Sequence, residues 1–362
     1  MERTDLISER QLSVLAFSGL LSPLIRMLPR SAVYLAGRSA WLSPAAAAAA
    51  GAAYFALMRA LLRGRGLRDG LAEMAGRALG SAGGKVFCAV SALWLTFYAG
   101  FIARSAAERL LSSVYTDGSA PMFSALLLAA SAAAAACGTK TLARTAEIFA
   151  PVILGIFALV IAFALPDVRA ANLLPVTYKD AGRILLGSLP ITDIVGASVY
   201  FLFLLSHVEK KPGEGKQPLR WMLLQMLVIL GVMVITVGSC GEKLTLHLGS
   251  AFFMVIRNIS ILGVIERVEA LVITIWITTD FLIDAALLMT DAEILRGIFG
   301  AERRAPFVIP AAAGAAASAL LAAKSAFGLQ PLSELLVPAA NLFFAFILIP
   351  AVLAVGKLRK KL

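Results

Sequence analysis

The chain has 362 residues, of which 60% are hydrophobic and only 15% are charged, a composition that excludes an ordinary soluble domain and is typical of a polytopic membrane protein. The formal net charge is +11, but the basic residues are spread over many loops, so we expect no nucleic-acid partner. The three cysteines and two histidines are scattered along the chain, so they predict neither a metal site nor another cofactor.

Ten apolar runs predict ten membrane-spanning helices, because each approaches the roughly 20 residues that cross a bilayer. Most of the 33 lysines and arginines then lie on the side of the N-terminus, which places both termini in the cytoplasm and favours contacts with anionic membrane lipids. An amphipathic stretch, 66–80, predicts a surface helix between the second and third spans. We expect one all-α polytopic membrane domain, 1–362, with spans near residues 11–36, 41–62, 86–111, 121–138, 148–165, 190–207, 220–239, 258–289, 305–324 and 335–356.

The first and sixth spans contain residues that disfavour a continuous helix. In "FSGLLSPLIRMLPR" (17–30), proline removes a backbone donor and is expected to open or kink the helix near 19–22. In "SLPITDIVGASVYFLF" (188–203), the weak points include Gly196 and Ala197. Proline and glycine are also simply common in membrane helices, and for either break alone this explanation is about as good.

The pairing of these two breaks favours a binding site. Because the spans are five apart, they predict a five-plus-five inverted repeat, with halves at about 11–165 and 190–356. Broken helices in matching positions of two halves are typical of a binding site at the bilayer midplane, where freed amides and carbonyls contact the ligand. We therefore expect Gly19, Ser22, Gly196 and Ala197 to be ligand-binding residues.

The eighth span carries four acids, Glu266, Glu269, Asp280 and Asp284, in an otherwise apolar stretch. At about 100° per residue they fall within an arc of about 60°, so they share one helix face. Acids in a membrane helix usually face a bundle interior or a water-filled cavity. We expect Asp280 to have an ion-coupling, gating or ligand role.

The remaining charged residues of this span have an alternative explanation. Glu266, Arg267 and Glu269 are candidates for ion coupling or gating, but they could instead form a structural cluster at the outer headgroups. Asp284 could likewise lie at the inner headgroups.

Four further side chains are candidates for the ligand pocket. Tyr98 lies near the middle of the third span and Tyr200 in the sixth, and a buried tyrosine hydroxyl needs a partner. Each could line the pocket or bond a neighbouring backbone carbonyl. Trp276 flanks the acidic face, and Thr279 could bond either a ligand or its own helix backbone.

Five short motifs, in this order and spacing, resemble the B-subunit permease of bacterial spore germinant receptors, a branch of the amino acid–polyamine–organocation superfamily. The resemblance implies ten helices of the leucine-transporter type, with broken helices 1 and 6. It also implies a small germinant, often an amino acid, bound among helices 1, 3, 6 and 8. The implied partners are an A subunit and a lipoprotein C subunit in the spore inner membrane. The motifs are "ISERQLSVL" (7–15), "LAGRSAWLS" (35–43), "GTKTLARTAEIFAPV" (138–152), "NLLPV" (172–176) and "GVIERVEALVITIWI" (263–277).

Three functions are compatible with these features, and an enzyme is not among them. The sequence has no phosphate loop, nucleophile elbow or zinc-binding helix pattern. We expect a permease-like receptor subunit that binds a germinant and triggers germination. Ion conduction through the subunit is one way in which it could do so. The alternative is an amino-acid transporter of the same fold, coupled to protons through Asp280 or to sodium through backbone carbonyls at the break. A third hypothesis is a scaffold whose pocket is vestigial.

Overall fold

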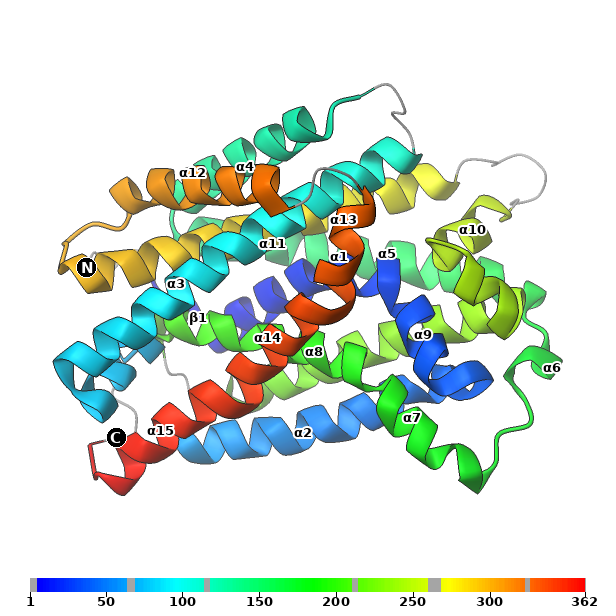
Figure 1. The fold of residues 1–362 in the computed structure, drawn as a ribbon, viewed down its shortest axis with the longest axis horizontal. Coiled ribbons are helices and arrows are strands. Elements are labelled where there is room, and N and C mark those ends of the chain that lie inside the picture. The colour runs from blue at the N-terminus through cyan, green and yellow to red at the C-terminus, as the bar shows by residue number, and fades with distance from the viewer. Residues whose placement is uncertain are drawn as a thin grey trace.

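The computed structural model describes residues 5–63, 69–113, 118–209, 214–259, 268–322 and 326–361, without the side chains of residues 22–27 and of a few residues that border a gap. Almost all of these residues lie in helices (Figure 1). The first half of the chain forms α1 (Glu9–Ala36), η2 (Gly37–Leu42), α2 (Ser43–Leu61), α3 (Leu71–Ser113), α4 (Ala120–Ala136), α5 (Thr139–Ala164), η3 (Leu165–Asp167), α6 (Ala170–Leu173) and η4 (Tyr178–Asp180).

The second half repeats this all-helical pattern with more short segments. The elements are α7 (Ala181–Gly187), α8 (Leu189–Ala197), η5 (Ser198–His207), η6 (Glu214–Lys216), α9 (Gln217–His247), α10 (Ala251–Arg257), α11 (Val268–Phe299), α12 (Ala305–Ala322), α13 (Ala326–Pro331), η7 (Leu332–Leu336), α14 (Val337–Leu342), η8 (Phe343–Leu348) and α15 (Ile349–Leu358).

One short parallel strand pair joins the start of the chain to the end of η5. In it β1 (Ile7–Ser8) pairs with β2 (Val208–Glu209), so that Ile7 lies opposite Val208. Ser8 then caps α1, because its Oγ accepts from the Gln11 backbone N–H at 3.1 Å while Gln11 Oε1 accepts from the Ser8 N–H at 3.0 Å. The first and sixth expected spans are therefore tied together at one end of the bundle.

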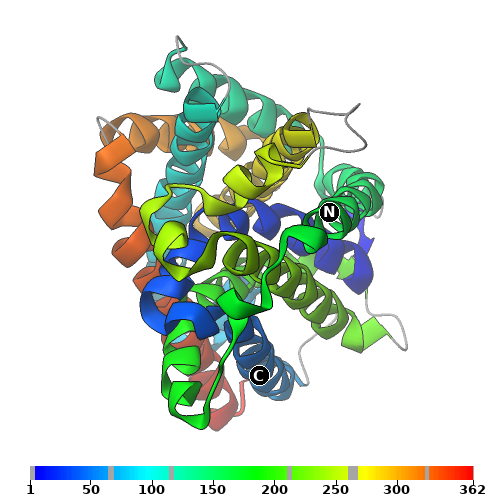
Figure 2. The same ribbon diagram turned by 90° about the vertical axis from the view of Figure 1, so that its right-hand side faces the viewer.

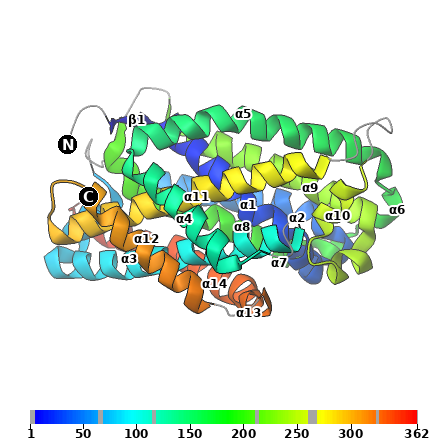
Figure 3. The same cartoon turned by 90° about the horizontal axis from the view of Figure 1, so that it is seen from above.

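α1 occupies the interior of the bundle, where it packs against α9, α11 and α5. Its N-terminal half is almost entirely buried. Figure 2 looks along the long axis of the molecule and shows the other helices arranged around this one. Figures 1 and 3 place both termini at the same end of the bundle.

Seven helices among the described residues are long and apolar enough to cross a membrane, and two shorter apolar helices, Ala120–Ala136 and Ala305–Leu321, accompany them. This count takes Leu28–Leu61 as one stretch, although α1 and α2 meet through η2 within it. The all-helical membrane fold is thus confirmed. The number of ten spans stays a prediction.

The two expected helix breaks take different forms. The backbone of α1 remains helical from Glu9 to Ala36, through Pro23, so the first span has no unwound segment. Figure 1 shows instead that the two halves of α1 run in different directions, as expected when proline bends a helix without ending it. In the sixth span α8 ends at Ala197 and the chain continues as the ten-residue 3-10 helix η5. A 3-10 run of this length is unusual and is typical of a functional hinge.

One expected boundary agrees with the structure and one is corrected. The surface helix predicted at 66–80 corresponds to the first part of α3, residues 71–79, because Gly80, at a φ of 85° and outside helical geometry, separates it by a kink from the third span. The eighth span was expected at 258–289, but α11 continues to Phe299, since the sequence after 289 is rich in helix-forming residues. Gly300 follows with a φ of 66°, a conformation that commonly ends a helix.

Candidate functional site

A cavity of about 280 Å³ lies between α1, α3, α8, α11 and the segment from η7 to α14. We call it the Asp193 cavity. Its walls come from four of the spans that the resemblance assigned to ligand binding, together with the last expected span. Its lining combines apolar side chains and three serines with five larger polar or charged side chains: Tyr98 and Arg109 from α3, Asp193 from α8, Asp280 from α11 and Glu334 from η7.

Asp193 is a buried carboxylate near the start of the sixth expected span. Pro190 lies in the first turn of α8, and the Thr192 hydroxyl donates to the Ser188 carbonyl at 2.8 Å, which holds that turn in place. Asp193 is only 8% exposed, and although the Asn341 amide is a near neighbour of this carboxylate, the Asp193 Oδ1 makes no hydrogen bond of acceptable geometry with a described residue. Because a buried carboxylate oxygen is costly without a partner, Asp193 is suited to bind a cationic group inside the cavity.

Arg109 and Asp280 form a buried ion pair between α3 and α11. The same guanidinium lies over the indole of Trp276, with Cζ 5.3 Å from the ring centroid. Arg109 and Asp280 both line the Asp193 cavity. The cavity therefore presents a guanidinium and a second carboxylate, and a planar guanidinium is well suited to bind a ligand carboxylate.

Asp284 lies one turn beyond Asp280 on α11 and is completely buried. Neither of its carboxylate oxygens has a hydrogen-bond partner among the described residues. The alternative that placed Asp284 at the inner headgroups is therefore wrong, because α11 continues beyond it to Phe299 and the side chain faces the protein interior. Asp280 and Asp284 point inward together, as expected for acids of one helix face.

An aromatic cluster with one amide partner adjoins the Asp193 cavity. The Tyr200 hydroxyl donates to Asn341 Oδ1 at 2.7 Å and accepts from Trp94 Nε1 at 2.7 Å. The Tyr98 ring stacks on Trp94 with centroids 6.0 Å apart and lies 6.2 Å from Tyr200. Tyr98 lines the cavity, whereas the Tyr200 hydroxyl is satisfied by two side chains rather than by a backbone carbonyl.

Gly19, Gly196 and Ala197, the small residues at the expected breaks of the first and sixth spans, lie where helices contact one another. A Cβ on Gly19 would lie 3.2 Å from the Ile283 Cα, so α1 and α11 meet closely there. A Cβ on Gly196 would lie 3.2 Å from the Ala345 Cβ, and Ala197 is buried. None of the three is among the residues that line the described Asp193 cavity. Their small size permits close helix packing next to the cavity.

The remaining candidates, from the eighth span and from the first, lie in different surroundings. The Thr279 hydroxyl donates to the Ile275 carbonyl at 2.8 Å, which is the second of the two alternatives for this residue. Trp276 is buried beside Arg109, and Glu269 is half-buried in the first turn of α11. Glu266, Arg267 and the side chain of Ser22 lie outside the described residues.

Sequence reasoning left Asp193, Arg109 and Asn341 out of the site. For Asp193 the sequence does carry a signal, since an acid between Pro190 and Gly196 in an apolar run is unusual in a membrane helix. Arg109 lies far from Asp280 in the sequence, so their pairing becomes visible once α3 and α11 are packed together. Asn341 carries no comparable local signal.

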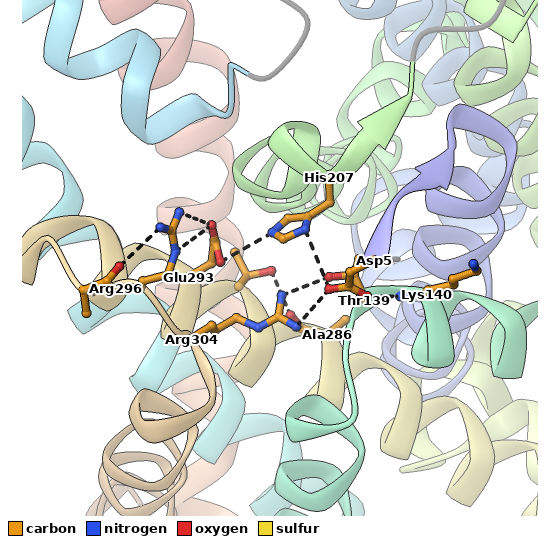
Figure 4. A network of polar contacts seen from close by, with 10 residues as sticks. Asp5, Thr139, Lys140, His207, Ala286, Glu293, Arg296 and Arg304 are labelled. Atoms are coloured by element: carbon orange, nitrogen blue, oxygen red, sulfur yellow. Dashed lines mark hydrogen bonds and ion pairs between the residues drawn. The ribbon is translucent and has the colours of Figure 1, made fainter. Parts of the chain in front are cut away.

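A second polar network, which we call the His207 network, includes Asp5 near the N-terminus and lies at the end of the bundle where Figures 1 and 3 place both termini. His207 ends η5 and is buried between two acids (Figure 4). Its Nε2 is 3.5 Å from Glu293 Oε2 on α11, and its Nδ1 is 3.8 Å from Asp5 Oδ2 near the start of the chain. The network therefore connects η5 to α11 and to the N-terminal segment.

Two arginines complete the His207 network. Arg296 donates from Nη2 to Glu293 Oε1 at 2.6 Å, one turn along α11. Arg304, just before α12, lies 3.7 Å from Asp5 Oδ2 and donates from Nη1 to Thr139 Oγ1 at 2.9 Å at the start of α5. Burial lowers the pKa of Arg304, although an arginine remains charged at neutral pH. The contacts thus join five elements at one end of the bundle.

Comparisons with known proteins agree with this architecture. A sequence model of a family described as "Spore germination protein" matches residues 6–326. Among solved structures, the fold is similar to that of Mhp1, a nucleobase-cation-symport-1 family transporter, in a closed conformation with bromovinylhydantoin bound. That match has a TM-score of 0.64 at 14% sequence identity and covers 96% of this chain and 80% of the other. No curated protein matches the sequence. The resemblance and the leucine-transporter type of fold are confirmed, and at this identity the structural likeness shows the fold alone.

Proposed function

Because the chain belongs to the spore germination protein family, we propose that it is a permease-like membrane subunit that binds an amino acid and triggers germination. The ligand occupies the Asp193 cavity near the bilayer midplane. The protein acts with an A subunit and a lipoprotein C subunit in the spore inner membrane, with both termini in the cytoplasm. A similar fold holds a small molecule in Mhp1, whose structure contains bromovinylhydantoin.

The observation that carries the proposal is the presence of opposite charges around one small cavity. Asp193 offers a carboxylate oxygen that has no partner among the described residues, and Arg109 offers a guanidinium. A zwitterion satisfies both, with its ammonium donating to Asp193 and its carboxylate accepting from Arg109. The volume of about 280 Å³ is near the lower end of the roughly 300–1,000 Å³ of small-molecule sites, which suits an amino acid.

The ion pair of Arg109 and Asp280 supplies a route from binding to conformational change. A ligand carboxylate that binds Arg109 competes with Asp280 for the same donors, and this weakens a contact between α3 and α11. A ligand shifts a conformational equilibrium by its differential affinity for two states, and this competition provides such a difference. The 3-10 helix η5, which follows the ligand-binding part of α8, is the element best suited to transmit the change.

Germination of spores that lack the gene tests the proposal. Dipicolinic acid release is followed against a panel of amino acids, sugars and nucleosides, together with uptake of each active compound into growing cells. We expect loss of release for one amino acid with unchanged uptake. Normal release for every compound, with loss of uptake of one of them, would contradict the receptor function.

A transporter of the same fold is the second candidate, and one observation favours it. Asp284 is completely buried next to Asp280, and its oxygens have no hydrogen-bond partner among the described residues. Carboxylates in such positions are typical of proton relays in membrane transporters. This function predicts amino-acid uptake driven by a proton gradient in vesicles that contain the purified chain. Sodium coupling through backbone carbonyls would instead make uptake depend on a sodium gradient.

A further inference from the structure

A second and larger cavity, of about 390 Å³, lies between α1, α2, η5 and the first part of α9. We call it the Gln225 cavity. None of its described lining residues also lines the Asp193 cavity. At the junction of α8 and η5, Asp193 and Ile194 face one cavity, and Val195 and Ser198 face the other. The two cavities are therefore separate spaces on different sides of the same chain segment.

Two buried polar groups in the Gln225 cavity lack partners among the described residues. Gln225 is 4% exposed, and its Nε2 makes no hydrogen bond; Tyr54 is 8% exposed, and its hydroxyl makes none. Both residues line the cavity. Because most buried polar groups in folded proteins are hydrogen-bonded, two such groups around one space point to an occupant that carries a hydrogen-bond acceptor.

The charges of the Gln225 cavity lie at one end. They are Glu9, Arg59 and Arg63, and the two arginines follow Tyr54 along α2 toward the end of the bundle that holds the termini. Along the helix axis Arg63 lies about 13 Å and Arg59 about 7.5 Å from Tyr54 at 1.5 Å per residue, and the Arg59 guanidinium lies near Gly215, as does the Glu9 carboxylate. The described residues around Gln225 and Tyr54 in this cavity are uncharged, so a charged ligand group there would remain uncompensated.

The rest of the lining is largely apolar and partly aromatic. Phe17 and Trp221 lie against each other with ring centroids 5.1 Å apart, and Tyr54 contacts the Phe346 ring with centroids at 4.6 Å. Leu20, Val199 and Met222 add aliphatic surface. Such walls favour an apolar ligand body, with the two polar groups fixing its orientation.

We propose that the Gln225 cavity is a second binding site, for a neutral and mainly apolar molecule that carries a carbonyl oxygen. The carbonyl accepts a hydrogen bond from Gln225 Nε2, and the Tyr54 hydroxyl donates to the same or a neighbouring oxygen of the ligand. The site differs from the Asp193 cavity in position and in chemistry, since it provides no pair of opposite charges around the polar groups. Its occupant contacts α1, η5 and α9 together, and this gives it influence over the relative positions of these elements.

Photolabelling of the full chain in lipid nanodiscs tests the proposal. The probe is benzophenone, which is itself a neutral aromatic ketone and crosslinks to neighbouring C–H bonds on irradiation. We expect saturable labelling of cavity residues such as Met58, Met222 and Leu202, mapped by mass spectrometry of the peptides. Ethyl benzoate, a neutral ester, should compete for the site, and the benzoate anion should compete much less.

Substitutions distinguish this site from general partitioning into the membrane. Gln225→Leu keeps the size of the side chain but removes the donor, and we expect the half-saturating benzophenone concentration to rise about fivefold, as for the loss of one hydrogen bond. Tyr54→Phe should act in the same direction while it preserves the ring contact with Phe346. Gln217→Leu, the same change at the first residue of α9 and outside the cavity lining, should leave labelling unchanged.

Three results would overturn the proposal. The first is labelling that does not saturate or that maps only to exposed side chains such as Leu57 and Leu223. The second is equal half-saturation in the Gln225→Leu and Gln217→Leu variants. The third is labelling that ethyl benzoate does not reduce, which would show that the cavity does not recognise a neutral carbonyl compound as such.

Discussion

Asp280 and Asp284 lie one turn apart on α11 and are both buried, but the structure gives them different surroundings. Asp280 is paired with Arg109 at the wall of the Asp193 cavity, whereas both oxygens of Asp284 lack a hydrogen-bond partner among the described residues. One helix face thus presents one carboxylate that is compensated and one that is not. The two acids should respond differently to the same substitution.

The ion pair predicts a rescue by double substitution. Arg109→Gln leaves the Asp280 carboxylate buried without its main cation, a change that typically costs about 3–5 kcal/mol. We expect much less Arg109→Gln protein in the membrane, as measured by immunoblot. Arg109→Gln with Asp280→Asn should restore the protein level but not germination. A double variant as unstable as Arg109→Gln alone would show that the pair is not what stabilises this contact.

Asp193→Asn should weaken the response to the germinant without loss of protein. The amide has the shape of the carboxylate but no charge, so it loses a charge-assisted hydrogen bond of about 1.5–3 kcal/mol to the ligand. The half-maximal germinant concentration should rise roughly 10- to 100-fold in a dipicolinic acid release assay. Asp167→Asn is the matched control, since it is the same substitution at an exposed position that does not line the cavity. Equal sensitivity of the two variants would place the ligand elsewhere.

Asp284→Asn separates the two proposed functions. Replacement of a buried acid that has no hydrogen-bond partner among the described residues should leave the unfolding temperature unchanged or raised. In the receptor function, germination persists in this variant. In the proton-coupled transporter function, uptake that depends on the proton gradient disappears while the protein level is kept. A large fall in unfolding temperature would mean that Asp284 has a stabilising contact.

A larger side chain at Gly19 should prevent the close approach of α1 to α11. An added Cβ would already lie 3.2 Å from the Ile283 backbone, so Gly19→Leu forces the two helices apart. We expect this change to lower the free energy of unfolding by about 1–3 kcal/mol. We expect loss of germination with retention of at least part of the protein in the membrane. Gly155→Leu on α5 is the control, because a Cβ at Gly155 meets no atom within 4 Å. Normal germinant sensitivity of Gly19→Leu would show that this helix contact is not needed for the response.

The His207 network should hold one end of the bundle together. Glu293→Gln removes the charge that lies 3.5 Å from His207 and pairs with Arg296, so η5 should separate from α11 more often. We expect a cysteine at Ser206, which is 4% exposed, to react roughly tenfold faster with a water-soluble maleimide in a background without the native cysteines. Glu302→Gln, at an exposed loop position, should not change this rate. Unchanged labelling in Glu293→Gln would show that other contacts keep this end closed.

The helices themselves were largely predictable, since long apolar runs are local features of the sequence. Pro23 predicted an opening or a kink in α1. Whether proline opens a helix or only bends it depends on the packing of the neighbouring helices around that turn. The prediction ended the eighth span at residue 289, but α11 continues to Phe299, and the acids Asp291 and Glu293 in this extension are buried by neighbouring elements. Thr96 on α3 donates to Asp291 at 2.6 Å, a contact that the sequence of α11 does not reveal.

By itself the sequence determined that this chain is an all-helical membrane protein of the spore germination family, that the first and sixth spans depart from a straight regular α-helix, and that the acids of α11 share a face. These properties follow from composition, from periodicity and from short motifs, all of which act over a few residues. The tertiary structure decided which acid has a partner and which residues surround a cavity. Arg109 meets Asp280, and Tyr200 meets Asn341, because helices far apart in the chain pack side by side. A buried charge or hydroxyl takes its role from the groups that packing brings within hydrogen-bond distance.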